Sequence, residues 1–199
     1  MAVHSGPGRL AGTFARPGSE AGDATLVRAA RLGDREAFEV VVERYGPALY
    51  RFARRMVRDH DEAQDVVQEA LVAAWRGLER FDGRSSLATW LFGITSHKAR
   101  DSLRRRRPEP VDPDLLTRPG RDTIDRSALS NPEEAMFLSD LAEALGQLSE
   151  RQRAVWLLTQ VEGLSTPEAA QALRMSADAV RGQLARARMS LTTRLEAWR

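Results

Sequence analysis

The chain has 199 residues, room for one medium domain or two small ones, and 42% of them are hydrophobic, which is enough to form a core. It contains no cysteine, which excludes disulfide scaffolds, cysteine-based zinc sites and thiol catalysis. No apolar run reaches the roughly 18 to 20 residues of a membrane span, and the N-terminus has no apolar signal core. We therefore expect a cytoplasmic protein with no membrane insertion of its own.

Charge is distributed unevenly along the chain. The formal net charge is +2, yet residues 24–107 carry +5, residues 108–173 carry −7 and residues 174–199 carry +4. Arginine supplies 29 of the 30 basic residues, and Lys98 is the only lysine. Arginine suits contacts with phosphates and base edges, although high-GC codon usage also enriches it. Charge alone is thus compatible with nucleic-acid binding and does not require it.

The first half of the chain predicts helices. Residues 1–24 are rich in glycine, have no helical or strand period, and are expected to be a disordered leader. Apolar residues recur every three or four positions from Phe38 to Met56, which predicts a helix with a kink or break at Gly46-Pro47. A second helix is expected over residues 61–78, and a third from Leu87 into the basic run that ends at Arg107.

The second half predicts four further helices after a linker. Residues 108–131 contain several prolines and a net negative charge, so we interpret them as an acidic, flexible linker. The four helices are expected to begin at Pro132, near Ser149, at Ser165 and after Ser176. No segment predicts a strand. The expected fold class is all-α, with two small helical domains, residues 25–107 and residues 132–199.

Residues 165–198 have the proportions of a helix-turn-helix motif. Polar and basic side chains on the exposed face of its second helix could reach phosphates or base edges in a major groove. These side chains are Asp178, Arg181, Gln183, Arg186 and Arg188. The alternative is an ordinary helical hairpin with a solvated polar face.

A second basic block runs from Arg104 to Arg107, after a helix that carries Trp90, Phe92 and His97. Aromatic residues interleaved with basic residues suit single-stranded nucleic acid, because bases stack and phosphates pair with cations. The alternative is a solvated helix end, since cations favour the C-terminal pole of a helix. Trp90 and Ile94 also lie on the apolar stripe of this helix, which favours core packing for both.

Neither an enzyme nor a metal site is expected. The run Asp59-His60-Asp61-Glu62 lies at a helix start, where acids are common, and no second histidine has metal-ligand spacing to it. The sequence has no Ser-His-Asp order, no phosphate-binding glycine loop and no HExxH motif. We therefore expect no catalytic residue and no cofactor.

Four stretches together resemble the bacterial sigma-70 family of RNA polymerase sigma factors, in its extracytoplasmic-function (ECF) branch. They are FEVVVERYGPALYRFARRMVR from Phe38, DEAQDVVQEALVAAWRGLERF from Asp61, SSLATWLFGITSHKARDSLRRR from Ser85, and residues 141–195 with their LSERQRAVWLLTQVEGLSTPEAAQAL core. The DVVQE and TWLFGI segments, in this order before a helix-turn-helix, are a specific signal.

The resemblance implies partners and residue roles. The helix over residues 61–78 would dock on the β′ clamp helices of core RNA polymerase. The loop over residues 81–86 would hold a base flipped from the −10 promoter element, at a cost of a few kcal/mol for extrusion, and the third helix would begin melting. The C-terminal motif would read the −35 element and contact the β flap. An anti-sigma factor is a common further partner in the family.

The residues carried over by this resemblance form three sets. The core-polymerase set is Asp61, Asp65, Gln68 and Glu69. The −10 set is Phe81, Asp82, Gly83, Arg84, Ser85, Ser86, His97, Lys98, Arg100, Asp101, Arg104 and Arg105. The −35 set is Ser176, Ala177, Asp178, Arg181, Gln183, Arg186 and Arg188.

Three positions depart from the family pattern. The usual acid before Asp65 is Gln64, an asparagine common in the third helix is His97, and the usual turn glycine is Arg174. We predict an ECF sigma factor. The alternatives are a stand-alone helix-turn-helix regulator, which would bind its operator without polymerase, and, more remotely, a helical nuclease.

Overall fold

The computed structural model describes residues 22–105 and 132–196, which are helical and contain no strand. The predicted all-α fold class is therefore confirmed for this part of the chain. No helix among these residues is long and apolar enough to cross a membrane. Nearly all of the predicted leader, the predicted linker and the arginines at 106 and 107 lie outside the described residues.

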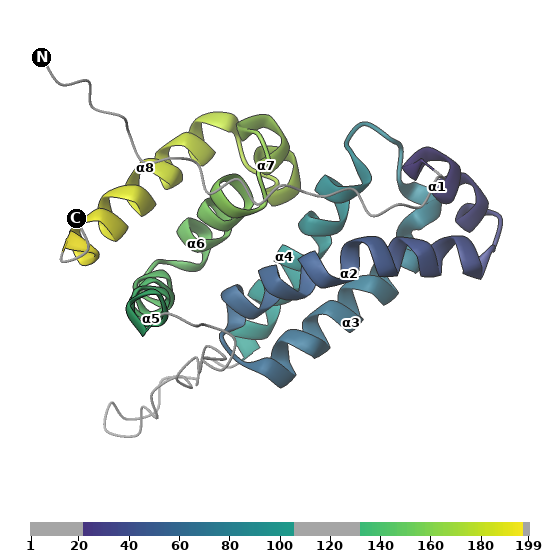
Figure 1. Cartoon of the computed structure of the whole chain (residues 1–199). Coiled ribbons are helices and arrows are strands. Elements are labelled where there is room, and N and C mark those ends of the chain that lie inside the picture. Colours follow the sequence, from purple (N-terminus) through teal and green to yellow (C-terminus); the bar gives the residue numbers. More distant parts are fainter. Residues whose placement is uncertain (1–21, 106–131, 197–199) are drawn as a thin grey trace, which may run out of the picture.

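Among the described residues, α2 to α8 follow one another in the order expected, and they are preceded by α1, which was not predicted as a separate helix (Figure 1). Their bounds are α1 (Asp23–Arg31), α2 (Arg35–Val57), α3 (His60–Gly77), the 3-10 turn η1 (Leu78–Arg80), α4 (Leu87–Arg105), α5 (Pro132–Gly146), α6 (Glu150–Trp156), the π-helical η4 (Leu157–Val161), α7 (Thr166–Leu173) and α8 (Ala177–Arg194). Because α1 begins at Asp23, the last two residues of the predicted leader are helical, which corrects that boundary.

Helices α1 to α4 form an N-terminal bundle around one apolar core. Phe52 of α2 and Phe92 of α4 are completely buried, and their rings meet edge to face at 5.6 Å. Leu49 and Met56 of α2 fill the space around them. A kink or a break was predicted at Gly46-Pro47, and the break does not occur, because α2 continues through Pro47. A proline removes one backbone donor, and here the buried residues on either side hold the helix together.

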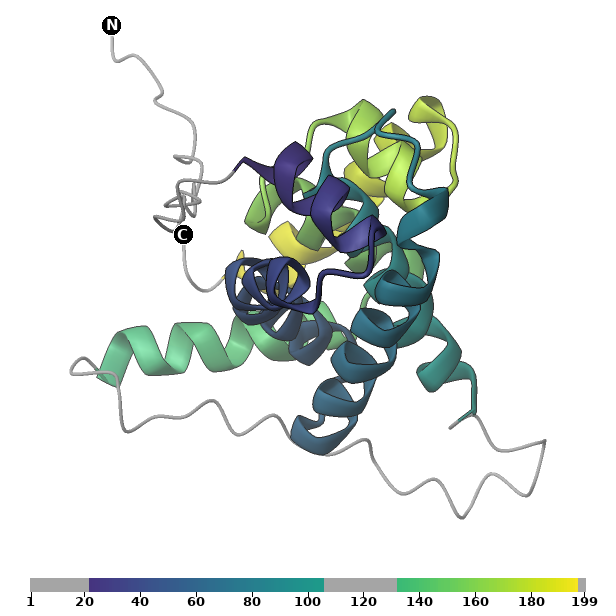
Figure 2. The ribbon, with the colours of Figure 1, turned by 90° about the vertical axis from the view of Figure 1, so that its right-hand side faces the viewer.

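Helices α5 to α8 form a C-terminal bundle whose helix starts are set by side-chain caps. Ser149 with Gln152 and Ser165 with Glu168 each form a capping box at the start of α6 and α7. The helix predicted to continue to Val161 instead widens into a π-helical turn, in which the Glu162 amide donates to the Leu157 carbonyl at 2.9 Å. Figure 2 shows the first half of α5 projecting beyond the other helices.

The two bundles pack against each other through α4 and α7. A Cβ atom at Gly93 of α4 would lie 3.0 Å from the Ala172 carbonyl oxygen of α7, so glycine permits this close approach. Arg153 of α6 is buried and donates to the Met56 carbonyl of α2 at 2.5 Å, as well as to Leu145 and Gly146 carbonyls at 2.9 and 2.8 Å. A buried guanidinium with these acceptors joins the ends of α2, α5 and α6.

Candidate functional site

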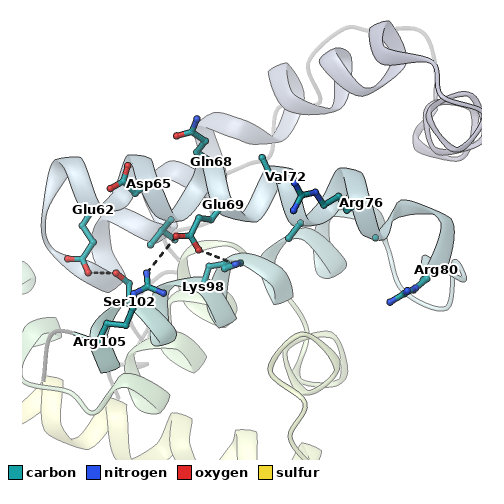
Figure 3. A pocket seen from close by; sticks show the side chains of 13 residues that line it. Glu62, Asp65, Gln68, Glu69, Val72, Arg76, Arg80, Lys98, Ser102 and Arg105 are labelled. Atoms are coloured by element: carbon teal, nitrogen blue, oxygen red, sulfur yellow. Dashed lines mark hydrogen bonds and ion pairs between the residues drawn. The ribbon is translucent and has the colours of Figure 1, made fainter. Parts of the chain in front are cut away.

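An open groove of about 850 Å³ runs along α3 and α4, and it contains most of the predicted polymerase-binding residues (Figure 3). Asp65, Gln68 and Glu69 of α3 are exposed on one wall, beside the exposed Val72. Asp61, in the first turn of α3, is exposed outside the groove lining. The other lining residues are Glu62, Val66, Ala73, Arg76, Gly77, Arg80, Lys98, Ser102 and Arg105.

The groove contains a charge network that joins two of the predicted sets. The carboxylate of Glu69 lies 3.0 Å from Lys98 Nζ and 3.7 Å from Arg105 Nη2 (Figure 3). Glu69 belongs to the predicted polymerase set, whereas Lys98 and Arg105 belong to the predicted −10 set. Deeper in the bundle, the buried Glu62 accepts a hydrogen bond from the Ser102 hydroxyl, which ties α3 to α4.

The loop over residues 81–86 is ordered by bonds within it and at its base. Phe81 is buried and packs on Trp90 with a ring separation of 5.0 Å, so this aromatic pair supports the loop from below. Asp82 accepts the Arg84 amide at 3.0 Å and pairs with its guanidinium, and these bonds from Arg84 lower the pKa of Asp82. Gly83 has a φ of +73°, and Ser86 Oγ caps α4 by accepting the Thr89 amide at 3.1 Å.

The predicted −10 residues on α4 differ in their exposure. Arg104 and Arg105 are exposed, while His97, Lys98, Arg100 and Asp101 are half-buried. His97 Nε2 and Arg100 Nε are buried without a hydrogen-bond partner among the described residues. Burial, followed by the cations Arg174 and Arg100, lowers the pKa of His97, and Asp101 opposes this shift. The folded arrangement therefore favours the neutral imidazole over the charged one.

The second helix of the predicted helix-turn-helix, α8, presents a polar face. Asp178, Arg181, Arg186 and Arg188 are exposed, as is the cap residue Ser176, while Ala177 and Gln183 are half-buried. Arg181 pairs with Asp178, and Arg188 donates to Gln160 Oε1 of η4 at 3.0 Å. In the turn before α8, Arg174 adopts the left-handed conformation with a φ of 52°. This conformation explains why glycine is common at the turn in the family that the sequence resembles.

The acidic run at the start of α3 has a structural role. Asp59 is the N-cap of α3 and accepts the Glu62 amide at 2.9 Å. Both ring nitrogens of His60 have partners, because Nδ1 lies 2.7 Å from the Tyr50 hydroxyl and Nε2 lies 3.1 Å from Gln64 Nε2. Within the described ranges, no group of three or more His, Cys, Asp or Glu residues could hold a metal ion.

Sequence reasoning missed two arginines that organise these surfaces. Arg153 crosses between the bundles as described above, and Arg31 of α1 donates to the Leu78, Glu79 and Phe81 carbonyls at the base of the loop. Backbone carbonyls have no signature in a sequence, so neither contact had a signal that could be read from residue types.

The chain matches known proteins over both bundles. The sigma-70 region 2 family matches residues 41–109, and the sigma-70 region 4 family matches residues 138–191. The RNA polymerase sigma factor CnrH of Cupriavidus metallidurans is 35% identical over 89% of this chain and 96% of its own length. The ECF RNA polymerase sigma-E factor of Escherichia coli K12 is 31% identical over 87% of this chain and 94% of its own.

The chain belongs to the sigma-70 family. It is an ECF RNA polymerase sigma factor, a non-catalytic subunit that initiates transcription at specific promoters.

Two solved structures share its fold. One is CnrH in complex with the cytosolic domain of CnrY, with a TM-score of 0.65, 34% identity, and coverage of 86% of this chain and 96% of CnrH. The other is the sigma factor RpoE of Bartonella quintana with the anti-sigma factor NepR, with a TM-score of 0.69, 29% identity, and coverage of 81% and 98%.

The family assignment decides between the functional classes that the sequence left open. The predicted sigma factor is confirmed, and the stand-alone regulator and the nuclease are not supported. As a sigma factor, the protein binds core RNA polymerase and promoter DNA. The N-terminal bundle contains region 2, and the C-terminal bundle contains region 4.

Proposed function

We propose that region 2 of this sigma factor binds the β′ clamp helices through the α3 wall of the groove. Asp65, Gln68 and Glu69 would make the contacts on this wall, and Asp61, outside the groove in the first turn of α3, would add a contact beside it. The observation that supports this proposal is the exposure of these acidic and amide groups beside the apolar Val72, on a helix whose opposite face is buried. Exposed acidic groups gathered on one face favour a partner surface of opposite charge, which speeds association and fixes the register of the two surfaces.

We infer that promoter DNA meets two further surfaces. The loop over residues 81–86 and the set on α4 would take the −10 element, the loop by holding a flipped base and α4 by pairing phosphates. The exposed polar face of α8 would read the −35 element in the major groove, with Ser176, Ala177 and Gln183 at its edge. The buried Phe81 would form the floor of the loop rather than contact a base.

We further infer an anti-sigma partner and a cytoplasmic site of action. The inference of a partner is supported by the two similar solved structures, in which RpoE is in complex with the anti-sigma factor NepR and CnrH with the cytosolic domain of CnrY. The cytoplasmic site follows from the sigma-factor function, because the polymerase and the promoter are there. We propose no particular signal for release.

The proposal is tested by reconstitution with cognate core RNA polymerase. The expected result is co-purification of the full-length protein with core polymerase and run-off transcription from a subset of genomic fragments. On those promoters the holoenzyme should protect both elements, and the sigma factor alone should not. Tight, sequence-specific duplex binding by the protein without polymerase would overturn the proposal, because a sigma factor is expected to recognise its promoter as part of the holoenzyme.

A further inference from the structure

Arg31 lies at the C-terminal end of α1, before the residues that the region 2 family matches. Its guanidinium reaches across to the chain that leaves α3. Nε donates to the Leu78 carbonyl at 3.1 Å, and Nη2 donates to the Glu79 carbonyl at 3.1 Å and to the Phe81 carbonyl. All three acceptors lie in or directly after the turn η1, which α1 contacts.

Of these carbonyls, that of Leu78 also accepts a backbone amide, from Phe81 at 3.1 Å, which closes the 3-10 turn, whereas no backbone donor to the Glu79 or Phe81 carbonyl is found among the described residues. The last carbonyls of a helix have no intrahelical partner, and here the chain tightens into a 3-10 turn before it becomes extended at Phe81. A planar guanidinium presents several donors in a fixed geometry, and a cation is also favoured at this pole of the helix. One side chain therefore holds three carbonyls within four residues, the last of which is immediately before Asp82.

The helix that carries Arg31 is itself anchored. At its N-terminal end, Asp23 pairs with Arg44 and accepts the Tyr45 hydroxyl at 2.5 Å. Burial and the bond to Asp23 raise the pKa of Tyr45, so its hydroxyl keeps the proton that it donates. Leu26, Val27 and Ala30 of α1 are buried, which packs the helix against the bundle. Thus α1 can act as a brace between α2 and the base of the loop.

We propose that Arg31 is a positioning residue for the −10 recognition loop. By holding the Phe81 carbonyl, it sets the point and direction from which residues 82–86 leave the bundle, and so keeps the loop in the shape that accepts a flipped base. Arg31 acts through the backbone and contacts no DNA. The inference rests on the proposed role of the loop.

The test uses full-length protein assembled with cognate core polymerase. Arg31→Gln removes the charge and the donor fork, Arg31→Lys keeps the charge without the planar fork, and Arg28→Gln is the matched control on an exposed position of the same helix. Promoter opening is followed by permanganate reactivity, closed-complex affinity by filter binding at several salt concentrations, and loop order by amide hydrogen exchange over residues 82–86 of the free protein.

We expect Arg31→Gln to slow opening by about tenfold, to speed exchange in the loop, and to leave closed-complex affinity and its salt dependence within about twofold of wild type. Arg31→Lys should recover less than half of the opening rate that Arg31→Gln loses, and Arg28→Gln should open the promoter at the wild-type rate. Full rescue by Arg31→Lys together with a flatter salt dependence for Arg31→Gln would overturn the proposal, because it would identify Arg31 as a phosphate contact.

A parallel variant separates this inference from the function on which it rests. Exchange of residues 82–86 for another loop should change which −10 sequences melt. If that exchange has no effect, the role of the loop fails, and the positioning role fails with it. If loop exchange changes melting preference while Arg31→Gln alters neither amide exchange nor opening, the role of the loop stands and the positioning role of Arg31 is overturned.

Discussion

Lys98 Nζ lies 3.0 Å from Glu69 Oε2, so the only lysine of the chain is paired with a carboxylate on the surface that we propose for polymerase binding. Arg105 lies on the other oxygen of the same carboxylate at 3.7 Å. All three side chains are a third or more exposed, and exposed pairs of this kind contribute at most about 1 kcal/mol. Lys98 and Arg105 can therefore exchange Glu69 for a DNA phosphate at little cost.

Charge reversal on α3 should weaken polymerase binding without unfolding the bundle. Asp65→Lys and Glu69→Lys change exposed positions outside the buried stripe of α3, so thermal unfolding should remain close to wild type. We expect the affinity for core polymerase to fall by at least about tenfold, or about 1.4 kcal/mol. Glu39→Lys, an exposed reversal on α2, serves as the control. Equal affinities for all four folded proteins would remove Asp65 and Glu69 from the interface.

Neutralising Lys98 should weaken promoter binding in a way that does not depend on sequence. In the holoenzyme, Lys98→Gln should reduce the slope of log K against log salt by about 0.7 to 0.9, the value for one lost phosphate contact. The control is Arg76→Gln, which lines the same groove but lies outside the proposed DNA set. A salt slope identical to that of wild type would show that Lys98 serves only to hold Glu69.

The helices were predictable from the sequence because their signals are local. Ser165 and Ser176 cap α7 and α8 as expected, since a serine before a helical run accepts the first free amides. The pattern of Ala and Val on α3 marked its buried face. Continuation of α2 through Pro47 was not predictable, because the packing of its neighbours outweighs the lost hydrogen bond.

The assembly of the site was less predictable, since it depends on residues far apart in sequence. The pairing of Glu69 with Lys98 spans 29 positions, and the bond from Arg153 to the Met56 carbonyl spans 97. Nothing in a single sequence fixes which faces of α4 and α7 meet, so the partial burial of His97 was not foreseen. The roles of the individual residues toward polymerase and DNA stay predictions.

Replacement of either arginine proposed to read the −35 element should show whether that side chain contacts a base edge or a phosphate. Arg181→Ala or Arg186→Ala should weaken holoenzyme recruitment by about 1–3 kcal/mol if the side chain contacts a base edge, and only at promoters that carry that base. A phosphate contact would instead weaken all promoters alike. Filter binding to promoters with single −35 substitutions distinguishes these results. Arg194→Ala, at the far end of α8, is the control. Wild-type recruitment by both variants would remove the exposed face of α8 from the interface.

Protonation of His97 should destabilise the packing of α4 on α7. In the unfolded chain His97 titrates near its ordinary pKa of 6.5, whereas burial and the cations Arg174 and Arg100 lower the pKa in the folded protein. Between these two pKa values the unfolded state binds a proton that the folded state does not. The free energy of unfolding should therefore fall as the pH drops below about 6.5, and this contribution is fully present above that pH.

The variant His97→Asn isolates this effect, because asparagine does not titrate. The buried Glu162 has a pKa raised by burial, and its protonation favours the folded state at low pH, with a sign opposite to that of His97. Since wild type and variant share Glu162, the difference between their melting temperatures depends on His97 alone. That difference should shift in favour of His97→Asn as the pH is lowered from about 7.5 to about 5.5, followed by circular dichroism at both values. A difference that stays constant over this range would mean that His97 protonates as easily in the folded protein as in the unfolded chain, and that α7 does not bury it in solution.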